Sequence, residues 1–244
     1  MQRCAVYLMI FGWQIFCPIL AAWGQGVDVS AAIAIDAAQS SRDPSKEKTS
    51  DESGVVVWLS PLQKVLEPRP AASAHPPYRL MQKDKQFIPH LLIVPTGTSV
   101  EFPNADPFFH NVFSLFNGKR FDLGLYESGS SRSVRFDREG VSYIFCNIHP
   151  EMGAVVLALS TPFYAVSGPD GAIVIHGVPS GSYSLNVWSE RAKPLEPEGL
   201  PREIQISSTA TNLGIIQMKA TVSARGNHKN KFGEPYRDMP GKPY

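Results

Sequence analysis

The chain has 244 residues, of which 43% are apolar and 18% are charged, and its formal net charge is +1. This length fits one or two compact domains with flexible ends. The small net charge gives no electrostatic reason to expect a nucleic acid or an anionic membrane surface as partner. Prolines and glycines, 21 and 19 in number, separate many short apolar runs, which is typical of an all-β protein.

The N-terminus has the pattern of an export signal. Met1-Gln2-Arg3 is a short region with one basic residue. An apolar run then extends from Cys4 to Trp23, and Ala22-Trp23-Gly24 suits cleavage. We therefore predict a signal peptide over residues 1–24, a periplasmic location, and no stable membrane insertion after cleavage. An uncleaved anchor is the alternative, because the apolar run is long enough to span a bilayer. Pro18 weakens that alternative.

The cysteine count bears on the mature protein. Cys4 and Cys17 lie in the signal, so the exported chain keeps only Cys146. A single thiol in an oxidising compartment has no partner for an internal disulfide and is open to oxidation unless burial or a metal protects it. A buried structural cysteine and a metal ligand are therefore the two interpretations, and the neighbouring His149 and Met152 favour the ligand.

Residues 25–77 form an N-terminal segment with a flexible linker and one or two strands. A small apolar piece runs from Val27 to Ala38, and the following residues are rich in Ser, Lys, Asp and Glu, which is typical of a flexible linker or a loop insertion. Val55–Leu59 is fully apolar and predicts a buried strand.

Residues 78–160 carry the regular strand signals of a β-sandwich. We expect strands at 78–83, 87–89, 91–95, 100–104, 132–136, 141–146 and 153–159. A polar loop containing residues 117–120 follows the segment around His110. The strand over 141–146 ends at Cys146.

Residues 161–218 predict a second, smaller antiparallel sandwich. We expect strands at 163–166, 172–175, 182–188, 203–206 and 213–218, with turns at 168–171 and 178–181. This unit has no cluster of His, Cys or carboxylates. Residues 219–244 hold six Lys or Arg against two Asp or Glu, so we expect a disordered basic tail.

The most informative stretch is the one from Cys146 to Met152. Cys146, His149 and Met152 are spaced three residues apart, so one tight loop can direct a thiolate, an imidazole and a thioether to one point. With His110 upstream they make one Cys, two His and a weak axial Met, the ligand set of a blue-copper electron-transfer centre. We predict one type-1 copper ion on His110, Cys146, His149 and Met152. Since protein donors fill this site, whereas catalytic zinc sites keep a position open, we expect no enzyme.

At these residues the chain resembles the cupredoxins, the family of plastocyanin and amicyanin. Gly140, Tyr143 and Phe145 resemble the glycine-to-cysteine strand of that family, and the loop spacing resembles that of amicyanin. Upstream, the resemblance rests on a run that ends with the metal-ligand segment: Phe87-x-Pro89, Gly97, Val100, Phe102, Asn104-x-Asp106 and His110-Asn111-Val112. It implies a cupredoxin-like Greek-key β-sandwich over residues 78–160. It also implies that the Asn111 backbone N–H bonds the Cys146 sulfur and that the Asn111 side chain pins the two ligand segments.

The longer arrangement is similar to exported bacterial proteins described as methylamine-utilisation or plastocyanin-like proteins. These join a cupredoxin domain to a small transthyretin-like or carboxypeptidase-regulatory-like β-sandwich. Residues 171–175, the 178–183 turn and Val187-Trp188 carry this second resemblance. Residues 25–77 depart from a minimal cupredoxin.

The predicted function is single-electron carriage between periplasmic redox proteins, an electron donor and an acceptor that bind transiently. Apolar residues near the two histidines, namely Phe108, Phe109, Pro150 and Met152, are candidates for the docking surface. Two alternatives stay open: copper binding and delivery through the same ligands, and a structural or glycan- or partner-binding role of the second sandwich. We expect His90 to be a packed or surface histidine and not a ligand.

Overall fold

The computed structural model describes residues 26–36, 51–63, 76–115, 118–195, 200–221 and 229–236. Within these ranges the chain forms 18 strands and no helix, which confirms the all-β prediction. Accordingly, this part of the chain offers no apolar helix long enough to cross a bilayer. The predicted signal peptide over residues 1–24 lies outside the described residues.

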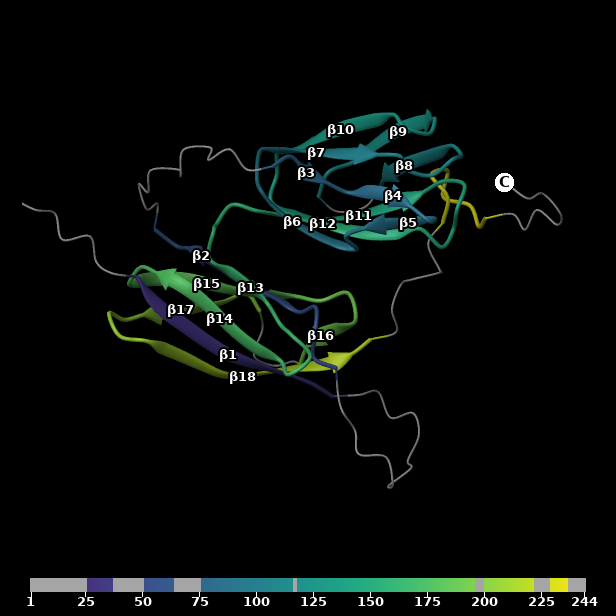
Figure 1. The fold of residues 1–244 in the computed structure, drawn as a ribbon. Helices are drawn as coiled ribbons and strands as arrows, with labels where there is room; N and C mark the ends of the chain where they lie inside the picture. Colours follow the sequence, from purple (N-terminus) through teal and green to yellow (C-terminus); the bar gives the residue numbers. More distant parts are fainter. Residues whose placement is uncertain are drawn as a thin grey trace, which may run out of the picture.

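The upper sandwich in Figure 1 is built from residues 78–159. One sheet has the order β10-β7-β3, a second has the order β6-β12-β11-β8-β9, and β4 and β5 form a hairpin. The strands are β3 (Tyr78–Arg79), β4 (Met81–Lys83), β5 (Gln86–Ile88), β6 (Leu91–Pro95), β7 (Thr98–Pro103), β8 (His110–Ser114), β9 (Phe121–Tyr126), β10 (Ser131–Phe136), β11 (Gly140–Cys146) and β12 (Gly153–Leu159). Alternating buried positions of β7, β10 and β11 supply the core between the sheets, with Phe102, Phe136 and Ile144 fully buried.

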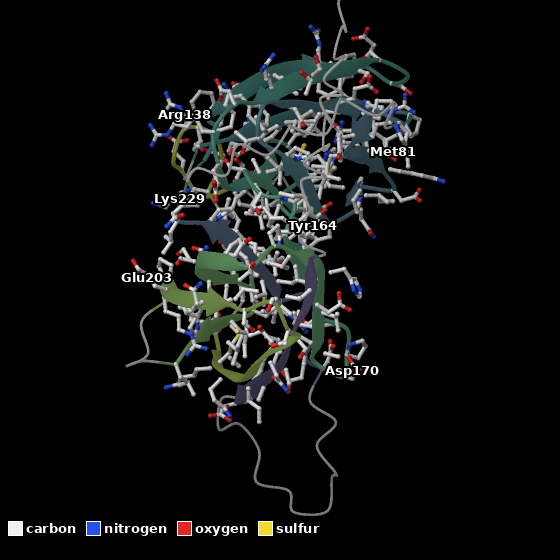
Figure 2. The ribbon with its side chains drawn as sticks, turned by 90° about the vertical axis from the view of Figure 1, so that its left-hand side faces the viewer. Met81, Arg138, Tyr164, Asp170, Glu203 and Lys229 are labelled. Carbon is white, nitrogen blue, oxygen red and sulfur yellow. The ribbon has the colours of Figure 1, made fainter. Side chains whose placement is uncertain are left out.

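The lower sandwich pairs two four-stranded sheets of order β14-β1-β18-β16 and β13-β2-β15-β17. Its strands are β1 (Val27–Asp36), β2 (Val56–Pro61), β13 (Tyr164–Val166), β14 (Ala172–Val178), β15 (Gly181–Trp188), β16 (Ala192–Pro194), β17 (Arg202–Ile206) and β18 (Thr211–Ala220). Figure 2 shows the two sandwiches end to end, with Tyr164 near their junction and Asp170 on the lower sandwich.

The sequence analysis expected the second sandwich to lie entirely within residues 161–218. The structure differs, because two of its strands come from the N-terminal segment. β1 lies between β14 and β18, antiparallel to the first and parallel to the second. β2 lies between β13 and β15. Each sheet therefore takes an interior strand from the N-terminal segment. Without β1, no strand would join β14 to β18 in the first sheet, and without β2, no strand would join β13 to β15 in the second.

An apolar contact joins the two sandwiches. Val56 of β2 packs with Leu157 and Leu159 of β12, and all three are buried. Trp58 and Trp188 lie at the margin of the same cluster. The contact places β2 of the lower sandwich against the sheet that carries β11 and β12 (Figure 1).

The C-terminal residues differ from the expected disordered tail in two places. β18 continues to Ala220, and residues 229–236 lie on the upper sandwich (Figure 1, yellow). The basic composition had suggested solvation, but Lys231 finds a carboxylate partner in Asp122. Residues 222–228 and 237–244 lie outside the described residues.

Candidate metal centre

Strand pairing brings the first histidine to the cysteine. β11 ends at Cys146 and β8 begins at His110, and the two strands are antiparallel neighbours with Cys146 opposite Val112. The end of one strand and the start of the other therefore lie at the same edge of the sheet. The loop after β11 then returns His149 to that edge.

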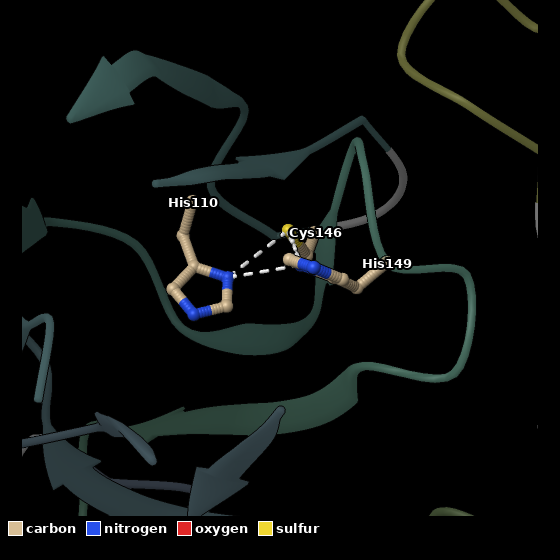
Figure 3. A group of neighbouring side chains, drawn as sticks. All are labelled: His110, Cys146 and His149. Atoms are coloured by element: carbon tan, nitrogen blue, oxygen red, sulfur yellow. Dashed lines mark hydrogen bonds between the residues drawn. The ribbon is translucent and has the colours of Figure 1, made fainter. Parts of the chain in front are cut away.

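The three donor atoms form a small triangle (Figure 3). The Cys146 sulfur lies 3.6 Å from His110 Nδ1 and 3.6 Å from His149 Nδ1, and the two nitrogens are 3.2 Å apart. The centre of such a triangle is about 2.0 Å from each corner, close to the length of a metal–imidazole bond. In the described part of the chain, this is the group of His, Cys and carboxylate side chains that is arranged to hold a metal ion.

Met152 closes the loop of residues 146–152, here called the ligand loop. Its backbone N–H donates to the His149 carbonyl at 3.0 Å, and its carbonyl accepts the Cys146 N–H at 3.3 Å. The Met152 side chain is fully buried in the core cluster that contains Cys146. The loop backbone therefore holds Cys146, His149 and Met152 in one compact turn.

Asp106 orients His110, a role that the sequence analysis missed. The Asp106 carboxylate lies 2.9 Å from His110 Nε2, and both side chains are buried. A neutral imidazole that donates from Nε2 has an unprotonated Nδ1, which is the atom turned to Cys146 and His149. The sequence signal was an aspartate four residues before the histidine.

Asp106 also holds the turn between β4 and β5. Its two oxygens accept the backbone N–H groups of Asp84 at 2.6 Å and Lys85 at 3.1 Å. Both turn residues have a φ of 54°, a left-handed conformation that non-glycine residues rarely adopt. The β4–β5 turn and His110 thus share one carboxylate.

Burial sets the protonation of the donors. Burial lowers the pKa of His110 and outweighs the hydrogen bond and charge of Asp106. Burial also lowers the pKa of His149, with repulsion from His110 as the next cause. Both rings are therefore neutral at pH 7, as ligation requires.

The thiol has opposing influences. Burial raises the pKa of Cys146, while hydrogen bonds from the backbone N–H groups of Asn111, Ile148 and His149 favour the thiolate. Cys146 is buried and forms no disulfide. The thiolate that a metal requires would thus find N–H donors already in place.

The resemblance implied that the Asn111 side chain links the His110 segment to the loop of residues 146–152. In the structure it makes no such link. Its Nδ2 donates to Asp122 Oδ1 at 2.6 Å and to the Gly124 carbonyl at 3.0 Å, both on β9. The link to the ligand loop is made by backbone: the Asn147 N–H donates to the Asn111 carbonyl at 2.9 Å. The sequence analysis placed no strand at β9 and so had no partner for this side chain.

The structure also places His90 and three of the residues predicted for a docking surface. His90 lies away from the triangle, where its ring contacts the Gly153 carbonyl at 3.0 Å and Glu190 at 2.6 Å. Phe109 is 51% exposed, whereas Met152 is fully buried and cannot belong to a docking surface. Phe108 packs against both imidazoles, with ring centroids 5.3 Å and 5.4 Å away.

Comparisons with known proteins give partial likenesses. No family model and no curated protein matches the chain. Among solved structures, a novel purple cupredoxin from Nitrosopumilus maritimus is 24% identical with a TM-score of 0.31, over 34% of this chain and 99% of that one. A Cu-containing nitrite reductase from Thermus scotoductus SA-01 is 23% identical with a TM-score of 0.34, over 38% of this chain and 26% of that one. The reduced Cu(I) form of an amicyanin mutant is 19% identical with a TM-score of 0.33, over 36% of this chain and 87% of that one. Each of these likenesses concerns little more than a third of the chain.

Proposed function

We propose that this chain is an exported type-1 copper protein that carries single electrons between redox partners. One observation carries the proposal: His110 Nδ1, His149 Nδ1 and Cys146 Sγ converge within 3.2–3.6 Å of one another at a buried edge of a β-sheet. Met152 would supply the thioether of the donor set. This donor set of one thiolate, two imidazoles and a thioether suits copper better than the harder metals, which prefer oxygen ligands.

Bound copper would supply one-electron chemistry. The residues of the chain supply the rest: Asp106 fixes the His110 tautomer, the backbone N–H groups stabilise the thiolate, and the sheet holds the three donors in place. A rigid site is suited to electron transfer, because little has to move when the charge changes.

Burial favours a carrier over a copper-delivery protein. His110 and Cys146 are fully buried and His149 is 8% exposed, so a metal ion on these atoms would be shielded from competing ligands. The His149 edge is the most exposed of the three and is the proposed exit for the electron. Exposed Phe109 and Ile148, which directly precede the two histidines in the chain, would be the contact with periplasmic redox proteins.

Two measurements, redox cycling and the rate of metal release, distinguish carriage from delivery. We expect the copper-loaded protein, residues 25–244, to be reduced by ascorbate and reoxidised by ferricyanide through repeated cycles without loss of metal. We expect a chelator such as EDTA to remove its Cu(II) slowly. Rapid loss to the chelator with poor cycling would support delivery and contradict the carrier proposal.

A further inference from the structure

Residues 229–236, here called the C-terminal strap, lie on the ligand loop although they follow the last strand of the other sandwich. The Lys231 N–H donates to Asn147 Oδ1 at 2.9 Å, and the Tyr236 hydroxyl donates to the Cys146 carbonyl at 2.8 Å. Two consecutive residues of the ligand loop, one of them the thiolate residue, therefore have a partner in the strap.

The strap also reaches the segment that carries His110. Lys231 Nζ lies 2.8 Å from Asp122 Oδ2, while Asp122 Oδ1 accepts the Asn111 side chain at 2.6 Å. Asn111 directly follows His110. A continuous chain of hydrogen bonds thus runs from the residue beside the first histidine, through Asp122 and Lys231, to the residue beside the cysteine.

The strap is an organised turn. Asn230 Oδ1 accepts the backbone N–H groups of Phe232 at 2.9 Å and Glu234 at 3.0 Å, and the Asn230 N–H donates to the Glu234 carbonyl. Gly233 occupies the left-handed region with a φ of 81°. This turn sets Lys231 and Tyr236 at fixed places relative to each other.

The donor groups of the strap suit a lasting contact. The Tyr236 hydroxyl donates to the Cys146 carbonyl at a partly buried position, where water competes less for the bond. The Lys231 ammonium meets a carboxylate that is partly covered, with 39% of the Asp122 side chain exposed.

We propose that the C-terminal strap is a clamp on the metal centre, with Lys231 and Tyr236 as positioning residues that hold the two ligand-bearing segments together and slow metal exchange. The clamp adds to the backbone bond from the Asn147 N–H to the Asn111 carbonyl, since the Asn111 side chain bonds to β9 instead. Only the effect on metal exchange rests on the proposed function. The effect on the two segments does not, because the strap contacts no side chain of a proposed ligand.

The test uses the full mature chain, residues 25–244, with Tyr236→Phe and Lys231→Met. Lys231→Arg keeps the cation for Asp122, and Tyr164→Phe and Lys193→Met are matched controls on the lower sandwich. The first readout is amide hydrogen exchange of peptides covering residues 145–153 in the metal-free protein. We expect clearly faster exchange there in Tyr236→Phe and Lys231→Met, and parent-like exchange in Lys231→Arg and both controls.

The second readout is the rate at which EDTA removes Cu(II). Because loss of outer partners of a metal site commonly costs about 10- to 100-fold in affinity, we expect release to accelerate by about tenfold in Tyr236→Phe. Parent-like exchange and release in both strap variants would overturn the clamp, as would faster exchange spread over the whole molecule. If the parent bound no copper through Cys146, the proposed function would fall while the hydrogen-exchange comparison still decided the clamp.

Discussion

The Asp106 carboxylate accepts hydrogen bonds from three N–H donors, and one of these donors is the ring of His110, a candidate metal ligand. We predict that Asp106→Asn lowers copper affinity by about 10- to 100-fold and raises the reduction potential. An amide has one acceptor oxygen and no charge. The His110 imidazole therefore becomes a weaker electron-pair donor to the metal, and the β4–β5 turn loses a hydrogen bond. Metal competition and voltammetry measure the two effects. Asp137→Asn, at an exposed carboxylate paired with Lys119, is the control; equal effects of both variants would contradict the assigned role.

Asp122 makes the stability of the upper sandwich depend on pH in the acid range. Burial raises the pKa of Asp122, but hydrogen bonds from Lys231, Asn111 and the Gly124 N–H outweigh it, and the net effect lowers the pKa. The stability that the ionised carboxylate contributes is therefore present above the unfolded-state pKa of about 3.9 and is lost as the pH falls through the lower folded-state pKa.

This predicts a pH-dependent difference between the parent and Asp122→Asn. The gap between their urea midpoints should be constant above about pH 5 and should shrink below about pH 4. A gap of the same size at acid and neutral pH would refute the assignment.

The candidate ligands could be proposed from the sequence, whereas the residues that support them could not. Cys146, His149 and Met152 lie within one loop, so their spacing alone brings them together, and the structure places His110 beside the first two. The role of Asp106 depends on a turn 22 residues earlier in the chain, and the partner of Asn111 depends on a strand. Such contacts are set by tertiary pairing, which local sequence patterns do not show.

The β8–β9 pair is where a strand element most directly supports the site. Its register shifts between Asn111 and Phe113, so the ladder is irregular one residue after His110. The Asn111 side chain bridges this irregularity through Asp122 and Gly124.

We predict that Asn111→Ala destabilises the upper sandwich by about 1–3 kcal/mol, because the Asp122 carboxylate and the Gly124 carbonyl lose a donor. Chemical denaturation of the metal-free protein measures this change. Asn212→Ala on β18 is the comparison, since its side chain accepts the Gly214 N–H at an exposed position within a strand of the other sandwich. A smaller effect at Asn111 than at Asn212 would contradict the bridging role.

Strands with strong local signals were predicted close to their observed bounds, as for β10, β11 and β12. β9 was missed: its residues Phe121–Tyr126 follow a polar turn and include an aspartate and a glycine, which weaken the strand pattern. The place of β1 was missed for another reason. It pairs with β14 and β18, and the residues it meets there, such as Ala172 and Ile216, lie far along the sequence.

At the scale of the whole molecule, the two sandwiches share buried apolar surface. Leu157 is fully buried on the face of β12 that meets Val56 of β2. We predict that Leu157→Ala costs about 2–5 kcal/mol and separates the unfolding of the two sandwiches into two steps. Fluorescence of Trp58 and Trp188, which lie at this contact, should report the change. Retention of a single transition at parent stability would exclude a coupling role for the contact.

The N-terminal segment is the second whole-molecule feature. Because β1 lies between β14 and β18, we predict that deletion of residues 26–36 prevents the lower sandwich from folding while the metal centre of the upper one persists. Amide exchange of peptides from both sandwiches measures this. Native protection of β14 and β18 in the deleted chain would contradict the observed strand order.

The most direct test of the central claim is the visible and EPR spectrum of residues 25–244 loaded with Cu(II), beside Cys146→Ser. The convergence of a thiolate with two imidazoles predicts an intense blue charge-transfer band and a narrow copper hyperfine splitting, both lost in the variant. A colourless protein, or an ordinary tetragonal copper signal that is the same in both proteins, would contradict a type-1 site at His110, Cys146 and His149.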